Sequence, residues 1–155
     1  MATLEVPATR TSPICQPLPA RIEDGAGSGG TDDPGSFTIA EAAAATGVSV
    51  HTLRYYERAG LMRDPVARAS SRHRRYTEDD VQWVTFLTRL RLTGMPIREM
   101  ARYARLASAG ESSKPERLAL LTEHRRRVLE QLDEVQRNLA LIDYKIAFYQ
   151  ERIAR

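Results

Sequence analysis

From residue 37 onward, apolar residues recur at the three- and four-residue spacing of amphipathic helices, and Ser or Thr residues stand where those helices would begin. An apolar residue, a Ser or Thr directly after it, and a second apolar residue five positions after the first form a hydrophobic staple with its N-cap. Segments 37–42, 48–53 and 76–81 have this arrangement. The pattern predicts helices over about 39–45, 50–59 and 78–93, the last of which Gly94 ends.

Two further helices follow in the same pattern. One runs from about Ile97 to Ala109 and ends at Gly110. The other starts near Ser113, where Ser113 and Glu116 have the spacing of a capping box, and continues to the C-terminus. Near the chain's first helix, Thr38 and Glu41 have the spacing of a capping box too.

Residues 61–76, between the second and third of these helices, have the pattern of a β-hairpin. The segment holds a short apolar start, a proline, a small and polar tip, and a return that ends in Tyr76. We expect a compact two-stranded wing. If the segment is judged without its neighbours, an irregular arginine-rich loop is the simpler interpretation.

Residues 1–36 form a distinct segment. They contain five prolines and the run GAGSGG at 25–30, without a periodic apolar pattern, so we expect a disordered tail. The tail has a charge of −3 and the remainder +6, which together give the net charge of +3. Cys15, the single cysteine, lies in the tail; it cannot form an internal disulfide, and we interpret it as an incidental exposed thiol in a reducing compartment.

Arginines are concentrated where the second helix meets the hairpin. Segment 48–76 carries seven arginines against Glu57 and Asp64, a balance that suits a polyanion such as DNA. An arginine-rich solvated surface explains the charge equally well. The chain has only two lysines, Lys114 and Lys145, so the arginine bias is also explained in part by genomic base composition.

The first two helices are joined by a tight turn with a glycine at position 47, which makes them a helix-turn-helix candidate. On a helical wheel of the second helix, Leu53 and Glu57 face one side with Val50, while Tyr55 projects from the opposite side beside His51. We expect Tyr56 to lie across the domain surface with its hydroxyl at the edge.

An outward polar face on the second helix, followed by hairpin arginines, could reach both the major groove and the phosphates beside it. The arginines also have plainer interpretations, because Arg54 could pair with Glu57 and Arg58 with another acidic neighbour. A packing role for Tyr56 is equally compatible. The candidate DNA-binding residues are Thr38, Ser49, His51, Thr52, Arg54, Tyr55, Tyr56, Arg58, Arg72, Arg74 and Arg75.

The sequence lacks the residue patterns that are typical of metal-binding proteins, enzymes and membrane proteins. His51, His73 and His124 are too scattered for a metal site, and no carboxylate or thiolate cluster accompanies them. The sequence has no paired catalytic carboxylates, nucleophile elbow or glycine-rich phosphate loop, so we expect no enzyme activity and no cofactor. No apolar run approaches the ~18 residues of a membrane span, and the N-terminus lacks a signal-peptide pattern; we expect a cytoplasmic protein.

The last helix carries a heptad seam of apolar residues whose steps alternate between three and four, interrupted by Arg125. Such a helix, about 58 Å long at ~1.5 Å per residue, is too long for the small domain to cover, so we expect a homodimer; a helix folded over its own domain is the alternative. The expected dimerisation residues are Leu121, Val128, Leu132, Val135, Leu139, Ile142, Ile146 and Tyr149.

The segments FTIAEAAAATGVSVHTLRYYERAGLM and RRYTEDDVQWVTFLTRLRLTGMPIREM, followed by the long helix, resemble the MerR family of bacterial transcription regulators over roughly 37–155. The most specific pieces are TLRYYE at 52–57 and RRYTEDDV at 74–81. The resemblance implies a mainly α fold: a winged helix-turn-helix DNA-binding domain over 37–110, then an antiparallel coiled-coil dimerisation helix over 111–155. It also implies that the second helix enters the major groove, while the tyrosines and wing arginines grip the backbone.

The resemblance further implies a mechanism. Such proteins bind palindromic sites between promoter elements that are spaced too far apart, and they distort the DNA so that RNA polymerase engages, which is indirect readout. Where the family commonly has a glycine and an aromatic residue in the wing, this chain has Arg72 and His73, so we expect a different turn at the wing tip.

The signal that such a regulator would answer is not given by the resemblance. Thiolate sensing of metals is excluded, because the sensing regions contain no cysteine. Arg89 stands where small, electrophile-responsive members have a cysteine, so a small-molecule effector, if there is one, is unknown. Two other classes remain open: a coiled-coil adaptor with a solvated basic head, and an architectural DNA-binding protein without ligand-dependent regulation.

Overall fold

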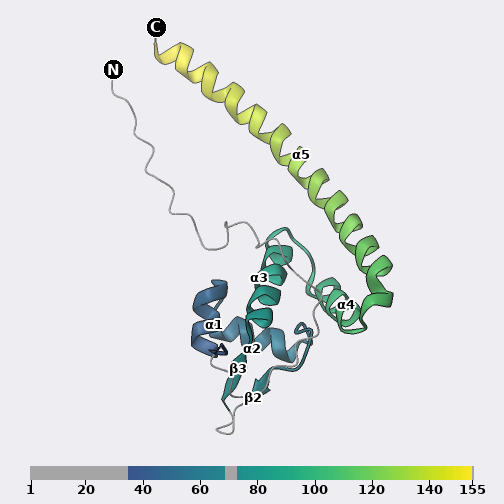
Figure 1. The fold of residues 1–155 in the computed structure, drawn as a ribbon. Coiled ribbons are helices and arrows are strands. Elements are labelled where there is room, and N and C mark those ends of the chain that lie inside the picture. Colours follow the sequence, from purple (N-terminus) through teal and green to yellow (C-terminus); the bar gives the residue numbers. More distant parts are fainter. Residues whose placement is uncertain (1–34, 69–72, 155) are drawn as a thin grey trace. The chain divides into compact units, whose positions relative to one another are not determined.

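The computed structural model of the chain describes residues 35–68 and 73–154 (Figure 1). They divide into two units, one that extends to Ala109 and one that begins at Gly110. The N-terminal unit consists of β1 (Phe37–Thr38), α1 (Ile39–Thr46), α2 (Val50–Arg58), β2 (Ala67–Arg68), β3 (Arg74–Tyr76), α3 (Glu78–Leu92) and α4 (Ile97–Ser108). The C-terminal unit consists of the 3₁₀ turn η2 (Glu111–Ser113) and α5 (Lys114–Ile153). The mainly helical fold and the five predicted helices are confirmed.

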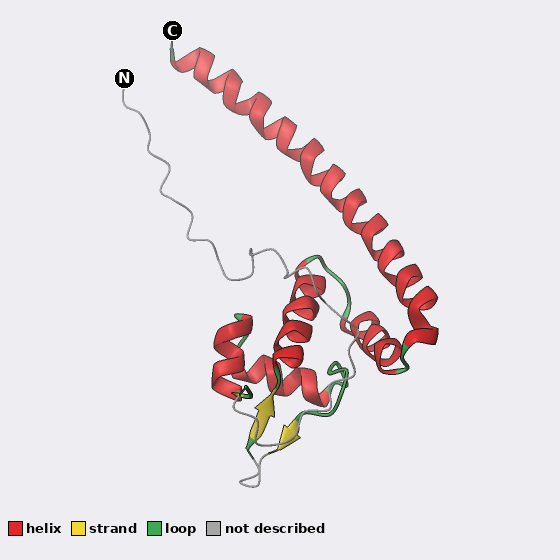
Figure 2. Cartoon of the chain, in the orientation of Figure 1, coloured by secondary structure: helices red, strands yellow, loops and turns green. Residues whose placement is uncertain are grey.

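The wing is an antiparallel sheet with the strand order β1-β3-β2, and Figure 2 shows its strands within an otherwise helical unit. Arg74 lies opposite Arg68, so β2 and β3 form the predicted hairpin. Phe37 pairs with Tyr76 and adds β1 at the other edge, a strand too short for a period-two pattern to predict. The wing tip at 69–72, with the DNA-binding candidate Arg72, lies outside the described residues, as do the tail to residue 34 and Cys15.

Helix caps set the geometry of the helix-turn-helix. The Thr38 hydroxyl accepts a hydrogen bond from the Glu41 amide at 3.3 Å, and the Thr38 amide donates to the Glu41 carboxylate at 2.7 Å, which confirms the capping box. The Thr38 amide and the Thr38 hydroxyl both donate to the Glu41 carboxylate, and these two bonds hold the pKa of Glu41 below its usual value. Gly47 ends α1 with φ 71°, a left-handed conformation that glycine adopts without strain. The Ser49 hydroxyl then accepts from the Thr52 amide at 3.0 Å and starts α2.

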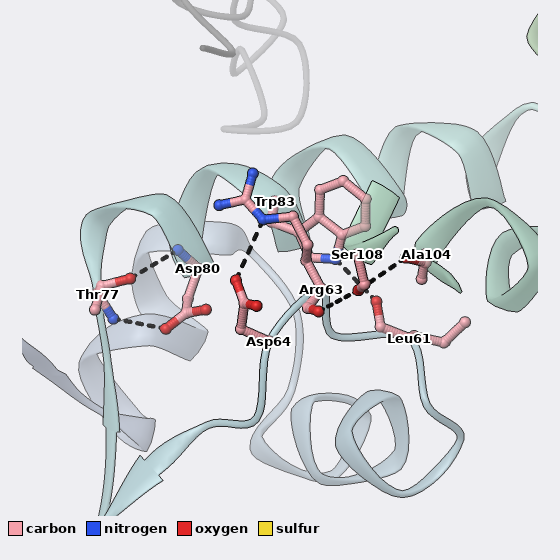
Figure 3. Close-up of polar contacts among 8 residues, drawn as sticks. All are labelled: Leu61, Arg63, Asp64, Thr77, Asp80, Trp83, Ala104 and Ser108. Carbon is pink, nitrogen blue, oxygen red and sulfur yellow. Dashed lines mark hydrogen bonds and ion pairs between the residues drawn. The ribbon is translucent and has the colours of Figure 1, made fainter. Parts of the chain in front are cut away.

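One predicted cap is wrong. Ser113 has helical backbone angles, and its hydroxyl donates back to the Gly110 carbonyl at 2.7 Å instead of accepting from the first turn of α5. The reason is the 3₁₀ turn Glu111–Ser113, which runs directly into α5 and leaves no extended residue to act as a cap. A box that was not predicted starts α3, where Thr77 and Asp80 bond reciprocally at 2.9 and 3.1 Å (Figure 3).

The core of the N-terminal unit is formed by apolar side chains of α1, α2, the segment after α2, β3, α3, the turn after α3, and α4. Trp83 of α3 stacks on Tyr103 of α4 with ring centroids 5.9 Å apart and an interplanar angle of 17°. The largest fully buried side chains are Tyr76, Leu53, Leu61, Leu87, Met95, Met100 and Val84. This core fixes α2 through its inner face and leaves its outer face free for contacts.

Polar contacts attach the segment after α2 to the two following helices (Figure 3). The Trp83 indole Nε1 donates to the Leu61 carbonyl at 2.8 Å, a buried hydrogen bond. The Ser108 hydroxyl donates to the Arg63 carbonyl, and the Arg63 guanidinium lies 5.8 Å from the centre of the Trp83 ring. The path from α2 to the wing is therefore held at its start by α3 and α4.

The Ser49 cap gives a direct test of what positions α2. We expect Ser49→Ala to lower the free energy of unfolding by about 1 kcal/mol, because an alanine leaves the Thr52 amide without its acceptor. Ser49→Asn, which supplies an equivalent acceptor, should stay close to the wild type. Urea unfolding followed by circular dichroism measures both, and equal losses in the two variants would contradict the cap's role.

Candidate nucleic-acid interface

The two adjacent tyrosines of α2 have different surroundings. Tyr55 is 40% exposed, whereas Tyr56 is 4% exposed, and their ring centroids are 6.3 Å apart. The Tyr56 side chain forms a hydrogen bond with Thr88 of α3, and burial raises the pKa of Tyr56. The predicted surface position of Tyr56 is therefore wrong: its hydroxyl is used within the core, and Tyr56 holds α2 against α3.

The outer face of α2 is polar and basic. His51, Arg54, Tyr55 and Arg58 are all exposed, while Leu53 is buried on the inner face. Thr52 is half-buried beside them. The structure thus brings together the central group of predicted contact residues on one exposed face of the helix.

Two other candidates serve the backbone of the protein itself. The Thr38 hydroxyl is used in the cap of α1, and the Ser49 hydroxyl bonds the Thr52 amide and lies 2.9 Å from the Thr52 hydroxyl in the cap of α2. Both residues are exposed, so contacts with a ligand are compatible with these caps. Their established task here is to begin the helices that carry the other candidates.

Glu57 of α2 joins the helix to the wing. The Arg74 Nε donates to one carboxylate oxygen of Glu57 at 2.5 Å, and the Arg68 Nη2 donates to the other at 3.4 Å. The hydrogen bond to Glu57 raises the pKa of Arg74 above its ordinary value. Glu57 therefore forms hydrogen bonds with an arginine on each hairpin strand. It does not pair with Arg54, the partner that the helix spacing allowed. Sequence reasoning missed this role, since its partners are 11 and 17 residues away.

The remaining wing arginine lies on the other side of β3. Arg75 is half-buried and pairs in register with Thr38 and Ala67. Because successive side chains of a strand point to opposite faces, Arg74 and Arg75 have different tasks. Arg74 braces the wing on α2, and Arg75 sits close enough to Glu41 to help lower the pKa of that carboxyl.

The described residues contain no grouping of three or more His, Cys, Asp or Glu side chains that could hold a metal ion. Within the same residues, no helix has the length and apolar character needed to cross a membrane. The features that the interface does present are an exposed basic helix face and a braced wing, which suit a double-stranded polyanion.

Comparison with known proteins identifies related chains. Residues 37–106 match the family described as MerR HTH family regulatory protein, and residues 81–153 match the one described as MerR, DNA binding. An uncharacterized HTH-type transcriptional regulator of Haemophilus influenzae is 38% identical over 116 residues, which cover 75% of this chain and 85% of that protein. The HTH-type transcriptional regulator AdhR of Bacillus subtilis is 36% identical over 94 residues, which cover 61% and 66%.

Solved structures show the same similarity. HiNmlR, described as a MerR family regulator lacking the sensor domain and bound to promoter DNA, has a TM-score of 0.69 and 38% identity, covering 77% of this chain and 94% of that one. A putative MerR family transcriptional regulator from Listeria monocytogenes has a TM-score of 0.70 and 34% identity, covering 74% and 86%. The similarity therefore extends over the helix-turn-helix, the wing and most of α5.

Proposed function

This chain belongs to the MerR family of DNA-binding transcriptional regulators, and from that premise we propose that it binds a palindromic promoter site as a homodimer and distorts the DNA to control transcription. In this proposal α2 enters the major groove and the wing contacts flanking phosphates. The observation that carries it is the outward face of α2, where Arg54 and Tyr55 are exposed while Leu53 and Tyr56 anchor the helix.

The proposed partners are promoter DNA, RNA polymerase at that promoter and a second copy of the chain. They imply action in the cytoplasm. The MerR family is a family of regulators and not of enzymes, in keeping with the expected absence of catalysis. The relative bound to promoter DNA supports the DNA partner, and the adaptor alternative is not favoured.

The second copy is proposed to pack on α5. This helix has 40 residues, so at ~1.5 Å per residue it is about 60 Å long. The seam residues from Leu132 to Tyr149 are exposed in the single chain. They form a continuous apolar stripe on α5 that no other described part of the chain buries. Burial of such a stripe against a second copy is the main stabilising term that we assign to the dimer.

DNA distortion has its own test. Promoter fragments of equal length that carry the binding site at different positions can be compared by gel mobility when the protein is bound. A bend at the centre of a fragment slows it more than a bend near its end, so mobility should be lowest when the site lies in the middle. Transcription in vitro with RNA polymerase should change when the protein is added. Position-independent mobility would rule out bending, and unchanged transcription would favour the architectural alternative.

We expect Glu57→Gln to weaken binding to the specific duplex by about ten-fold, because Arg68 and Arg74 lose the carboxylate that braces the wing. Binding to a non-specific duplex should stay the same or strengthen, since one negative charge leaves and both arginines remain. Fluorescence anisotropy with the two duplexes measures this loss of specificity.

Glu78→Gln is the matched control for Glu57→Gln. It removes the same charge from the exposed first turn of α3 and leaves the brace intact. If Glu57→Gln and the control bind the specific duplex equally well, the wing does not depend on Glu57 for its position.

A further inference from the structure

A chain of two buried hydrogen bonds connects α2 to the backbone of α3. The side chains of Tyr56 and Thr88 bond each other, and the Thr88 hydroxyl also bonds the Val84 carbonyl at 2.8 Å. A hydroxyl carries one proton and a carbonyl carries none. Thr88 therefore donates to Val84, and Tyr56 donates to Thr88, so the direction of both bonds is fixed.

This hydroxyl chain, formed by Tyr56, Thr88 and the Val84 carbonyl, is shielded from water. All three residues are buried. A hydrogen bond in such surroundings is electrostatically stronger than one in water. Apolar burial, as at Leu53, is not directional. A directional bond to α3 can therefore specify how far α2 is rotated about its own axis, which apolar contacts leave less sharply defined.

The rotation of α2 decides where its outer face points. With side chains, a helix has a radius of about 5–6 Å, so a rotation by about 10° moves a side-chain tip by about 1 Å. Donor–acceptor distances in hydrogen bonds vary over only about 0.5 Å. A small rotation would therefore misalign Arg54 and Tyr55, both exposed, with the groups that they contact.

Tyr56 also touches Tyr55 directly. The two ring centroids are 6.3 Å apart and the rings are tilted by 53°. Aromatic pairs at this separation attract each other when tilted. The anchored ring of Tyr56 therefore supports the exposed ring beside it.

We propose that Thr88 is a positioning residue for DNA recognition, which acts through Tyr56 to set the rotation of α2 and so the direction of its outer face. Thr88 is buried in α3 and acts without contacting DNA itself. The inference rests on the proposed function, because it requires that the outer face of α2 reads the duplex.

The test removes both hydroxyls together in the full chain. Tyr56→Phe with Thr88→Val replaces both partners by apolar groups of the same shape, so the free energy of unfolding should change little. Affinity for the inverted-repeat duplex that the wild-type chain selects from a random pool should fall by about ten-fold. Affinity for a non-specific duplex should stay within about two-fold, since every phosphate-binding charge remains. Fluorescence anisotropy and urea unfolding measure these quantities.

Tyr56→Phe alone is the second variant. It leaves Thr88 bonded to Val84 and every hydroxyl of the chain satisfied, so it should fold and show a similar loss of specific affinity. Thr88→Ser keeps the acceptor for Tyr56 and should keep specific affinity close to that of the wild type. A Thr88→Ser variant that binds the selected duplex as poorly as Tyr56→Phe would overturn the proposal.

Thr85→Val is the matched control. Thr85 lies on the same helix, is half-buried, and its hydroxyl donates to the Val81 carbonyl at 2.8 Å, the same back-bond that Thr88 makes. Among the described residues it has no hydrogen-bond partner on α2. The control should bind the selected duplex like the wild type. An equal loss in Thr85→Val and in the double variant would mean that the effect comes from α3 alone.

A cycle with Tyr55→Ala tests whether the hydroxyl chain acts on the outer face. If it does, the losses from Tyr55→Ala and from Tyr56→Phe with Thr88→Val should be less than additive. Additive losses would overturn the proposal. Failure of the inference is distinct from failure of the proposed function: a wild-type chain that selects no duplex overturns both. A wild-type chain that selects one, which the double variant binds equally tightly, overturns only the role of Thr88.

Discussion

Replacing Arg54 and Tyr55 together with alanine should weaken binding to the specific palindromic duplex by at least about 100-fold. Both side chains are exposed on the outer face of α2, and Leu53 beneath them holds the helix in place. An arginine in a DNA groove contributes about 1–3 kcal/mol, and a homodimer presents each residue twice. Fluorescence anisotropy at one fixed salt concentration measures the loss.

The matched control removes the same two residue types elsewhere. Arg137→Ala with Tyr144→Ala empties an exposed face of α5 opposite the seam. This control should keep the wild-type affinity for DNA. Equal affinities in the two double variants would show that α2 is not the recognition helix, because the loss would then not depend on its outer face.

Trp83→Ala should lower the free energy of unfolding of the N-terminal unit by about 3–5 kcal/mol. The ring is buried and stacks on Tyr103, Phe86 lies 6.1 Å from it, and its indole satisfies the Leu61 carbonyl at 2.8 Å. Small domains are stable by about 5–15 kcal/mol, so this variant should also lose much of its DNA binding. Urea unfolding followed by circular dichroism gives the change.

Two further variants separate the parts of the Trp83 effect. Trp83→Phe keeps an aromatic ring but leaves the Leu61 carbonyl without its donor, so a smaller loss of about 1–3 kcal/mol is expected. Leu92→Ala, at a position 62% exposed on the same helix, should change stability by less than about 0.5 kcal/mol. A Trp83→Ala variant as stable as Leu92→Ala would mean that the aromatic cluster does not hold α3 to α4.

The helices and the wing could be predicted because their signals are local. Ser49 and Gly47 lie next to the turn that they shape, and the Thr38–Glu41 box spans three residues. The outward direction of Tyr55 followed from the wheel of a single helix. Resemblance to a known family then supplied the arrangement of wing and helix, which local spacing does not determine.

What could not be predicted depends on contacts between distant residues. Tyr56 lies about 60° from Leu53 on the wheel, and whether it is buried depends on Thr88 of α3. Glu57 could have paired within its own helix, yet the fold brings Arg68 and Arg74 to it. The Ser113 cap failed for a local reason, since a 3₁₀ turn and a capping box compete for the same residue.

Selection of duplexes from a random-sequence pool by the full chain decides whether this protein reads a palindromic DNA sequence. We predict that the pool becomes enriched in one inverted repeat. Binding to that repeat should weaken steeply with salt, each phosphate contact adding about 0.9 to the negative log-log slope. A pool without an enriched inverted repeat, selected by a protein that still dimerises, would contradict sequence-specific recognition by a two-fold dimer.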